Sequence, residues 1–163
     1  MSNYYQIGLP DEQATLDAGA ALASMLTGSE LILLEGDLGA GKTTLSRGLL
    51  RGLGHEGSVK SPTFTLVEPY DLGSGRQVFH FDLYRLGDPD ELEYIGIDDY
   101  LDSHQLCLVE WPERGEGFLP PGDLTVRLTT RGRGRQMTIE ANSQHGERIV
   151  RRLIAGQGPN DGR

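Results

Sequence analysis

The sequence has few of the features that mark secreted or membrane proteins. A single cysteine, Cys107, stands in an apolar run and can form no internal disulfide. No apolar run approaches the roughly eighteen residues that a membrane-spanning helix needs. The first residues have neither a positive start nor the apolar segment of a secretion signal. We therefore expect a protein of the reducing cytoplasm that has no membrane association.

Positive charge is also scarce. The 163 residues carry 15 Lys and Arg against 24 Asp and Glu, which gives a formal net charge of −9, and Lys42 and Lys60 are the only lysines. Contacts to nucleic-acid phosphates need clustered positive side chains. The charge therefore argues against the chain binding nucleic acid alone, and any RNA would meet a partner protein first. His80 and His104 have no second histidine at ligand spacing, which argues against zinc.

What the sequence does contain is a glycine-rich phosphate-binding motif. Residues 36–43 read GDLGAGKT and fit the pattern G-x-x-x-x-G-K-[ST] at every required position. The apolar run at 31–34 has the length of a buried strand, and the segment after the motif repeats leucine at helical spacing, so strand, loop and helix stand in the required order. We expect the loop amides and the helix N-terminus to bind phosphates, with Lys42 reaching the β- and γ-phosphates and Thr43 holding Mg²⁺.

We interpret this motif as an ATP site; the preference for adenine rests on the absence of the guanine-reading motif N-K-x-D from the chain and on the family resemblance described below. The nucleotide-binding residues expected in this segment are Asp37, Leu38, Gly39, Ala40, Gly41, Lys42, Thr43 and Thr44.

The remaining patterns predict one α/β domain over residues 1–155 and a disordered tail at 156–163. We expect a three-layer, P-loop NTPase-like sandwich whose central parallel sheet is extended by antiparallel strands within 64–82 and 124–141. We predict four helices. The first begins at the N-cap Asp11 and ends at about Leu26, and the second follows Thr43 and ends near 52–54. The third begins at Asp88 and passes through Ile95, and the last covers 146–154. The predicted strands cover 64–67, 77–82, 106–110, 124–128 and 137–141, with turns at 71–75 and 131–135.

Two carboxylates follow predicted strands. Glu110 ends the apolar run at 106–109, where a P-loop protein needs an acidic group near Mg²⁺. A polar residue that only caps a strand is the alternative. Asp82 follows the strand at 77–81 and is a candidate for orienting or deprotonating the attacking water, or else an exposed turn carboxylate. Thr63 is either a γ-phosphate sensor of a switch loop or an ordinary loop threonine.

Two further features have open interpretations. Trp111 either stacks in the site or fills the core, and core packing is the preferred reading of the residue alone. The basic hairpin tip Arg131–Arg135 either contacts a nucleotide, RNA or a partner carboxylate, or is a solvated turn. Two rival functions share the motif: a small-molecule kinase, for which no clear arginine-bearing lid is found, and a nucleotide-gated binding module without hydrolysis.

Four segments together resemble the bacterial TsaE family, formerly YjeE. They are GDLGAGKT at 36–43, SPTF at 61–64, HFDLYR at 80–85 and VEWPE at 109–113, and the similarity extends over roughly 9–153. The resemblance implies an ATPase required for threonylcarbamoyladenosine in tRNA, acting with the TsaB and TsaD proteins and meeting tRNA only through that complex. It implies that hydrolysis, weak alone and stimulated by the partners, resets the complex between turnovers.

The resemblance also implies roles for single positions. Lys42 would bind phosphate, Thr43 and Glu110 would hold Mg²⁺, and Asp82 would be the catalytic or water-positioning carboxylate. Lys42 and Glu110 are expected to share the catalytic work, and Arg85 or a partner arginine to supply a further cation. The other implied positions approach the nucleotide: Asp11, Thr63, Trp111, Glu113 and Arg135.

Overall fold

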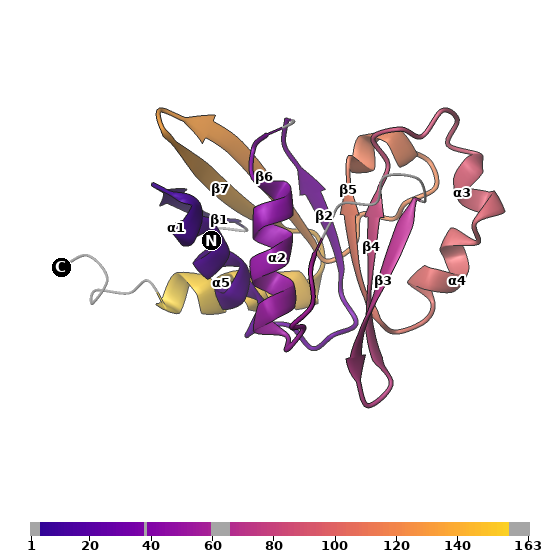
Figure 1. The fold of residues 1–163 in the computed structure, drawn as a ribbon, viewed down its shortest axis with the longest axis horizontal. Coiled ribbons are helices and arrows are strands. Elements are labelled where there is room, and N and C mark those ends of the chain that lie inside the picture. The colour runs from indigo at the N-terminus through magenta and orange to yellow at the C-terminus, as the bar shows by residue number, and fades with distance from the viewer. Residues whose placement is uncertain (1–3, 38, 60–65, 157–163) are drawn as a thin grey trace.

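One mixed β-sheet organises the molecule (Figure 1). The computed structural model describes residues 4–37, 39–59 and 66–156. The sheet has seven strands in the order β1-β7-β6-β2-β5-β4-β3. Their bounds are β1 Tyr4–Leu9, β2 Leu31–Glu35, β3 Val67–Gly73, β4 Arg76–Asp82, β5 Leu106–Glu110, β6 Leu124–Arg131 and β7 Gly134–Ala141. The helices are α1 Glu12–Ala23, α2 Lys42–Gly52, α3 Glu91–Tyr94, α4 Ile97–Leu101 and α5 Gln144–Gly156, with a 3₁₀ turn, η1, at Pro112–Gly115.

The centre of the sheet is parallel and its edges are antiparallel. β2 lies between β5 and β6 and is parallel to both, and β4 is parallel to β5. The antiparallel pairs are β3 with β4, β6 with β7, and β7 with β1. The predicted arrangement is confirmed in outline, but β4 and β6 belong to the parallel part. The antiparallel extension therefore consists of β3 on one side and β7 with β1 on the other.

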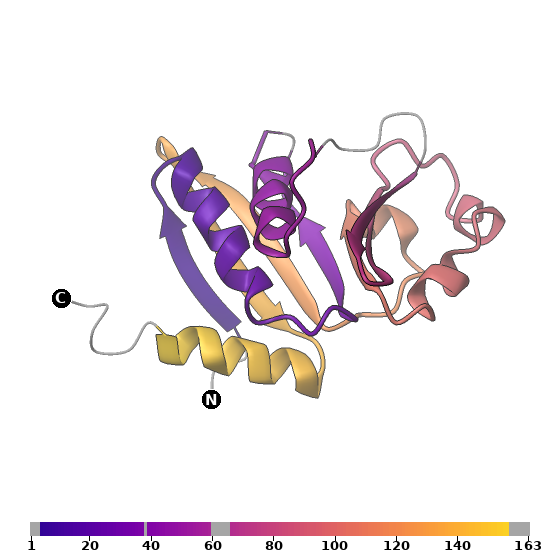
Figure 2. The same ribbon diagram turned by 60° about the horizontal axis from the view of Figure 1, so that its bottom comes forward.

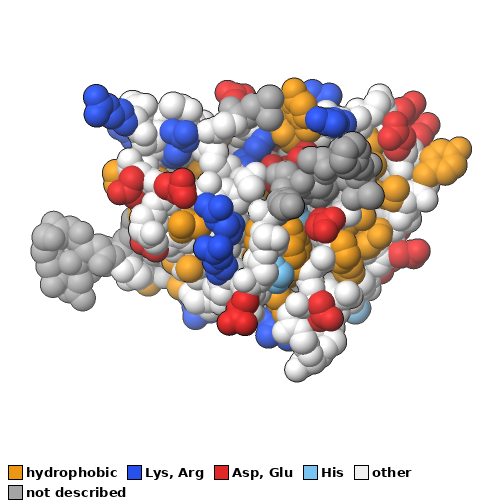
Figure 3. Space-filling view, in the orientation of Figure 1, with side chains coloured by type: hydrophobic (Ala, Val, Ile, Leu, Met, Phe, Trp, Pro, Cys, Tyr) orange, Lys and Arg blue, Asp and Glu red, His pale blue; other side chains and the backbone are white. Residues whose placement is uncertain are grey.

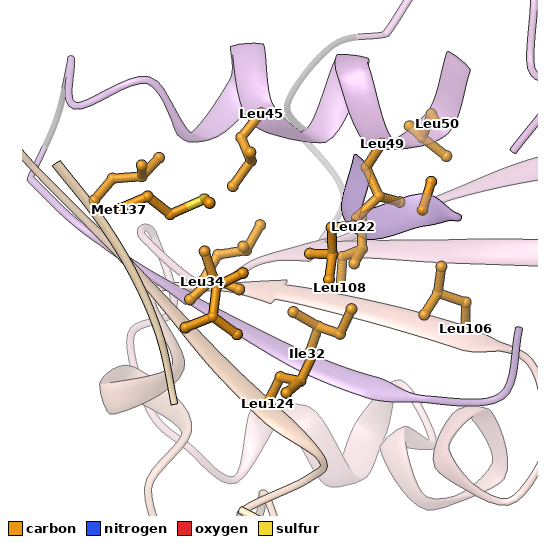
Figure 4. Packing of buried hydrophobic residues seen from close by; sticks show 14 of the residues in the cluster. Leu22, Ile32, Leu34, Leu45, Leu49, Leu50, Leu106, Leu108, Leu124 and Met137 are labelled. Carbon is orange, nitrogen blue, oxygen red and sulfur yellow. The ribbon is translucent and has the colours of Figure 1, made fainter. Parts of the chain in front are cut away.

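Helices cover both faces of the sheet. Alternate residues of β2 and β5 point to opposite sides, as the pleat requires. On one side Ile32, Leu34 and Leu108 pack under Leu45 and Leu49 of α2, as Figure 4 shows. The residues that face the other side join a second cluster with α3 and α4: Leu31, Phe81, Leu92, Ile97, Cys107 and Val109. β5 is buried on both faces, which explains its unbroken apolar sequence.

The helices α1 and α2 pack closely, because glycines line their contact. A Cβ at Gly48 would lie 2.3 Å from the Leu16 carbonyl oxygen, and one at Gly19 would lie 2.4 Å from the Leu45 carbonyl oxygen. No other residue type permits this approach of the two backbones. The contact places the start of α1 beside the start of α2, and Figure 2 shows both helices on the same face of the sheet with α5 along its end.

Charge is distributed unevenly over the surface. Figure 3 shows acidic side chains gathered over the edge that carries α3 and α4. Residues 86–113, which form this edge and β5, contain no Lys or Arg. This edge therefore lacks the clustered positive side chains that nucleic-acid phosphates need.

Several predicted boundaries need correction. The first helix ends at Ala23 rather than Leu26, although Asp11 is its N-cap as predicted. The expected turn at 71–75 is mostly strand, because β3 continues to Gly73 and only Ser74 and Gly75 connect it to β4.

Other elements differ in extent or were not predicted. β1 and α4 were absent from the sequence-based prediction, and the last helix is longer at both ends and includes Gly156. Residues 157–163 of the predicted tail and 64–65 of the predicted strand lie outside the described residues. No helix in the described part of the chain is both long enough and apolar enough to cross a membrane.

Candidate nucleotide-binding site

A cavity of about 460 Å³ opens where the parallel strands end and α2 begins. Ligands of open α/β sheets bind at this edge, outside the carboxyl ends of the strands. The residues that line it come from the end of β1, the loop between β2 and α2, the starts of α1 and α2, the ends of β4 and β5 with the residues that follow them, and the β6–β7 turn with the start of β7. They are Leu9, Asp11, Glu12, Thr15, Gly39, Gly41, Lys42, Thr43, Thr44, Asp82, Tyr84, Glu110, Trp111, Arg133, Gly134 and Arg135.

The glycine-rich loop joins β2 to α2 as the motif predicts. Gly39 and Gly41 have φ angles of +80° and +103°, a region that residues with a Cβ rarely adopt. Gly41 is the N-cap of α2 and supplies no side-chain hydrogen bond to the first turn. The first turn of α2 therefore meets the cavity without a protein cap, and its positive end suits an anion.

Lys42 is buried at the floor of the cavity. Its side chain is 5% exposed, donates a hydrogen bond to the Gly36 carbonyl oxygen, and places Nζ 3.8 Å from the centre of the Trp111 ring. Burial lowers the pKa of Lys42, and the negative charges of Glu110 and Asp82 oppose that shift. A buried ammonium with these neighbours is suited to receive a phosphate.

Two carboxylates stand opposite each other at the strand ends. Asp82 of β4 and Glu110 of β5 are register partners, so both side chains lie on the α2 face. Asp82 accepts a hydrogen bond of 3.0 Å from the Tyr84 amide. Burial raises the pKa of Asp82 and the Glu110 charge adds to the rise, against the Tyr84 hydrogen bond, His80 and Lys42. A carboxylate with a raised pKa is a better proton acceptor than an exposed one.

Glu110 is held by a histidine. It is 3% exposed, and its Oε2 lies 2.6 Å from Nε2 of His80, which is fully buried. His80 lies two residues before Asp82 on β4 and so faces the same side of the sheet. The sequence-based prediction considered His80 only as a zinc ligand and missed its hydrogen bond with Glu110.

Trp111 lies between the site and the second core cluster. Its backbone is in the left-handed region, with φ of +57°, which costs about 1–3 kcal/mol for a residue of this kind. The half-buried ring contacts Lys42 and lies 5.0 Å from the Tyr84 ring. Trp111 also packs against the core cluster beside α3 and α4, so both alternatives predicted for it, core packing and stacking in the site, describe part of its surroundings.

The possible metal ligands in the cavity suit Mg²⁺ better than they suit a metal ion that is bound by protein side chains alone. Within the described residues, no three His, Cys, Asp or Glu side chains form a metal-binding group. Mg²⁺ needs few protein ligands, since it keeps several waters and takes substrate phosphates. The Glu110 carboxylate and the Thr43 hydroxyl, which both line the cavity, are ligands of the required kind.

Comparison with known proteins assigns the chain to a family. The family model described as "Threonylcarbamoyl adenosine biosynthesis protein TsaE" matches residues 9–138. The chain belongs to the TsaE family.

Individual relatives agree with this assignment. The tRNA threonylcarbamoyladenosine biosynthesis protein TsaE of Haemophilus influenzae is 46% identical over 147 residues, which cover 87% of this chain and 92% of the relative. The protein of the same name from Bacillus subtilis is 38% identical over 125 residues, covering 76% and 77%. The crystal structure of Bacillus subtilis YdiB superposes with a TM-score of 0.79 at 27% identity and covers 97% of this chain and 99% of YdiB. The TsaE fold thus extends over nearly the whole chain.

Most site residues expected from the TsaE resemblance meet in the cavity. Those that line it are Asp11, Gly39, Gly41, Lys42, Thr43, Thr44, Asp82, Glu110, Trp111 and Arg135. Asp37, Ala40 and Glu113 are described but do not line it, and neither does Arg85, which is exposed. Leu38 and Thr63 lie outside the described residues.

Two of these residues support the walls of the cavity. Asp11 accepts a hydrogen bond of 2.8 Å from the Ala14 amide as the N-cap of α1. Arg135 donates from Nε to the Ala40 carbonyl, at 3.1 Å, and from Nη2 to the Gly39 carbonyl, at 3.0 Å. Arg135 is therefore bound to the loop itself.

The sequence reading missed several lining residues of this TsaE site. Leu9, Glu12 and Thr15 line the side formed by β1 and α1, and no local pattern singles them out. Tyr84 and Arg133 had a weak signal, since they lie in the HFDLYR segment and in the basic hairpin tip.

Proposed function

We propose that this TsaE-family protein is a Mg²⁺-dependent P-loop ATPase that acts in tRNA threonylcarbamoyladenosine biosynthesis with TsaB and TsaD. The observation that carries the proposal is the meeting of buried Lys42 with Asp82 and Glu110 in one cavity behind the glycine-rich loop. A phosphate cradle, a cation and two carboxylates are the parts that phosphoryl transfer to water requires.

The protein's contribution is electrostatic and positional. Lys42 and the first turn of α2 bind the phosphates and stabilise the charge that develops on them. Asp82 orients the attacking water and accepts its proton on the carboxylate. Trp111 and Tyr84 cover the cavity beside Lys42 and limit the access of other water molecules.

Thr43 and Glu110 would hold Mg²⁺. When bound, the ion neutralises phosphate charge that Lys42 alone cannot balance. Glu110 fits this task because its carboxylate is buried and already fixed on one oxygen by His80.

The partners follow from the family and from charge. Relatives carry the name of the biosynthetic pathway of the modified tRNA, while a net charge of −9 disfavours direct tRNA binding. We propose that the protein meets tRNA only through TsaB–TsaD, that its hydrolysis is slow alone, and that hydrolysis resets the complex between turnovers. A cation supplied by a partner raises such rates in other P-loop proteins.

The test is ATP hydrolysis by the purified protein, alone and with TsaB–TsaD, for wild type, Glu110→Gln and Asp82→Asn. We expect stimulation by the pair, and a loss of about a hundredfold or more in both variants. Glu140→Gln, a change at an exposed β7 carboxylate, is the matched control and should retain wild-type activity. Tight ATP binding without hydrolysis under any condition would replace the ATPase with a nucleotide-gated module, and phosphoryl transfer to a metabolite would favour a kinase.

A further inference from the structure

Two opposite charges share the cavity without pairing. Lys42 and Glu110 are 5% and 3% exposed and line the same space. Among the described residues, the ion pairs within 4 Å do not include these two. Lys42 donates to the Gly36 carbonyl, and Glu110 is bound to His80. Each charge is thus held by a partner of its own.

Direct contact between these charges would disable both. In a poorly solvated site a carboxylate and an ammonium attract each other strongly. A phosphate would then have to displace Glu110 from Lys42 before binding. Mg²⁺ would likewise have to compete with the ammonium for the carboxylate. A residue that keeps the two side chains apart therefore leaves each of them able to bind its own ligand.

His80 has the placement for this task. It lies opposite Leu108 in the pairing of β4 with β5, while Glu110 lies opposite Asp82. The Glu110 side chain therefore reaches back along the strands to place Oε2 2.6 Å from His80 Nε2. Because an ionised carboxylate only accepts hydrogen bonds, Nε2 carries the hydrogen. This bond occupies Oε2, and Glu110 also lines the cavity.

We propose that His80 is a positioning residue that holds the Glu110 carboxylate away from Lys42, which keeps the lysine available to an anion and one oxygen of Glu110 available to a cation. The assignment of Lys42 to an anion and of Glu110 to a cation rests on the proposed function. The separation of the two charges does not rest on it, since it is a property of the nucleotide-free protein.

The first experiment therefore uses the nucleotide-free, Mg²⁺-free protein. With lysine labelled by ¹³C and ¹⁵N, NMR at one pH follows the side-chain signals of the two lysines of the chain, and Lys42→Arg assigns them. His80→Leu should move the Lys42 signal, because Glu110 moves onto the ammonium. Adding Glu110→Gln to His80→Leu should return the signal to its place in Glu110→Gln alone. His80→Gln, which keeps a donor, should stay close to wild type.

A second readout is the affinity for ATP without Mg²⁺, measured by calorimetry. His80→Leu should weaken binding by about tenfold or more, and the added Glu110→Gln should restore it. A purely structural role of His80 predicts no such restoration. If the leucine variant does not fold, His80→Asn serves the same purpose, because its shorter side chain does not reach Glu110.

The outcomes separate the two proposals. An unmoved Lys42 signal in His80→Leu or His80→Asn, or a loss that Glu110→Gln does not reverse, would overturn the positioning role. If the signals behave as expected while the wild type binds no ATP, the ATP site is refuted and the positioning role stands.

Discussion

The ammonium of Lys42 lies 3.8 Å from the centre of the ring of Trp111, the only tryptophan in the chain. Lys42 is the first residue of α2, and Trp111 directly follows β5. The ring face is electron-rich and attracts the cation, so Trp111 stabilises a charge that burial disfavours. This contact explains why a tryptophan with a left-handed backbone is placed beside the phosphate loop.

Trp111→Ala should weaken ATP binding. A cation–π contact contributes about 0.5–2 kcal/mol, so we expect the dissociation constant to rise by about two- to thirtyfold when the ring no longer holds Lys42 in place. Trp111→Phe keeps a smaller aromatic face and should lose less. Calorimetric titration with ATP measures both variants, and an affinity equal to wild type in Trp111→Ala would show that the ring only covers the site.

Asp82→Asn should stabilise the protein at neutral pH. Because burial raises the pKa of Asp82, the folded chain binds this proton more tightly than the unfolded chain. Above the raised pKa the ionised carboxylate therefore lowers the free energy of unfolding. This loss of stability disappears as the pH falls through the raised pKa toward the ordinary pKa of an aspartate. The Asn oxygen can still accept from the Tyr84 amide. Thermal unfolding should give a higher Tm for the variant near neutral pH.

The difference in Tm should shrink in acid, where wild-type Asp82 is protonated. Glu140→Gln, at an exposed carboxylate, is the control and should not raise the Tm near neutral pH. A lower Tm for Asp82→Asn at neutral pH would mean that the ionised group stabilises the fold.

The local parts of this structure were predictable from the sequence. The strand at 106–110 has the expected bounds, and the helix expected after Thr43 is present, although it already begins at Lys42, because an unbroken apolar run and a leucine repeat are properties of neighbouring residues. The N-cap at Asp11 is likewise local. The phosphate motif fixed the position of the cavity, since it specifies strand, loop and helix together.

The missed features depend on contacts between distant segments. β1 is held by pairing with β7, where Tyr4 lies opposite Glu140. No pattern among the residues near β1 in the sequence predicts that pairing. The contact between His80 and Glu110 requires β4 to lie beside β5 in one register. The alternation of side chains along a strand places His80 on the same face of the sheet as Asp82, but it does not show which strand lies next to β4.

Gly48→Ala should destabilise the fold. Its Cβ would lie 2.3 Å from the Leu16 carbonyl oxygen, so α1 and α2 would have to move apart. Such overpacking costs about 1–3 kcal/mol or more, and each kcal/mol lowers Tm by roughly 2–4 °C in a chain of this size. Gly8→Ala, where nothing lies within 4 Å, is the matched control for thermal unfolding. Equal Tm values for the two variants would show that the helices can adjust.

Arg135→Ala should loosen the phosphate loop. The guanidinium bridges the carbonyls of Gly39 and Ala40 at 3.0 and 3.1 Å, and a planar fork makes two such bonds where a lysine makes a single point contact. Without it, hydrogen exchange at the amides of residues 39–41 should speed up in the nucleotide-free protein. ATP affinity should fall by about tenfold, since hydrogen bonds to a charged group contribute about 1.5–3 kcal/mol.

Arg135→Lys distinguishes the ordering of the loop by the guanidinium from an effect of positive charge alone. A loop-ordering role predicts fast exchange and weak binding in both Arg135→Ala and Arg135→Lys, whereas Arg131→Ala, at the exposed tip of the same hairpin, should match wild type. A direct contact of Arg135 with ATP predicts instead that exchange in the nucleotide-free protein is unchanged while affinity falls. The exchange rate without nucleotide therefore decides whether Arg135 acts through the loop or on the ligand.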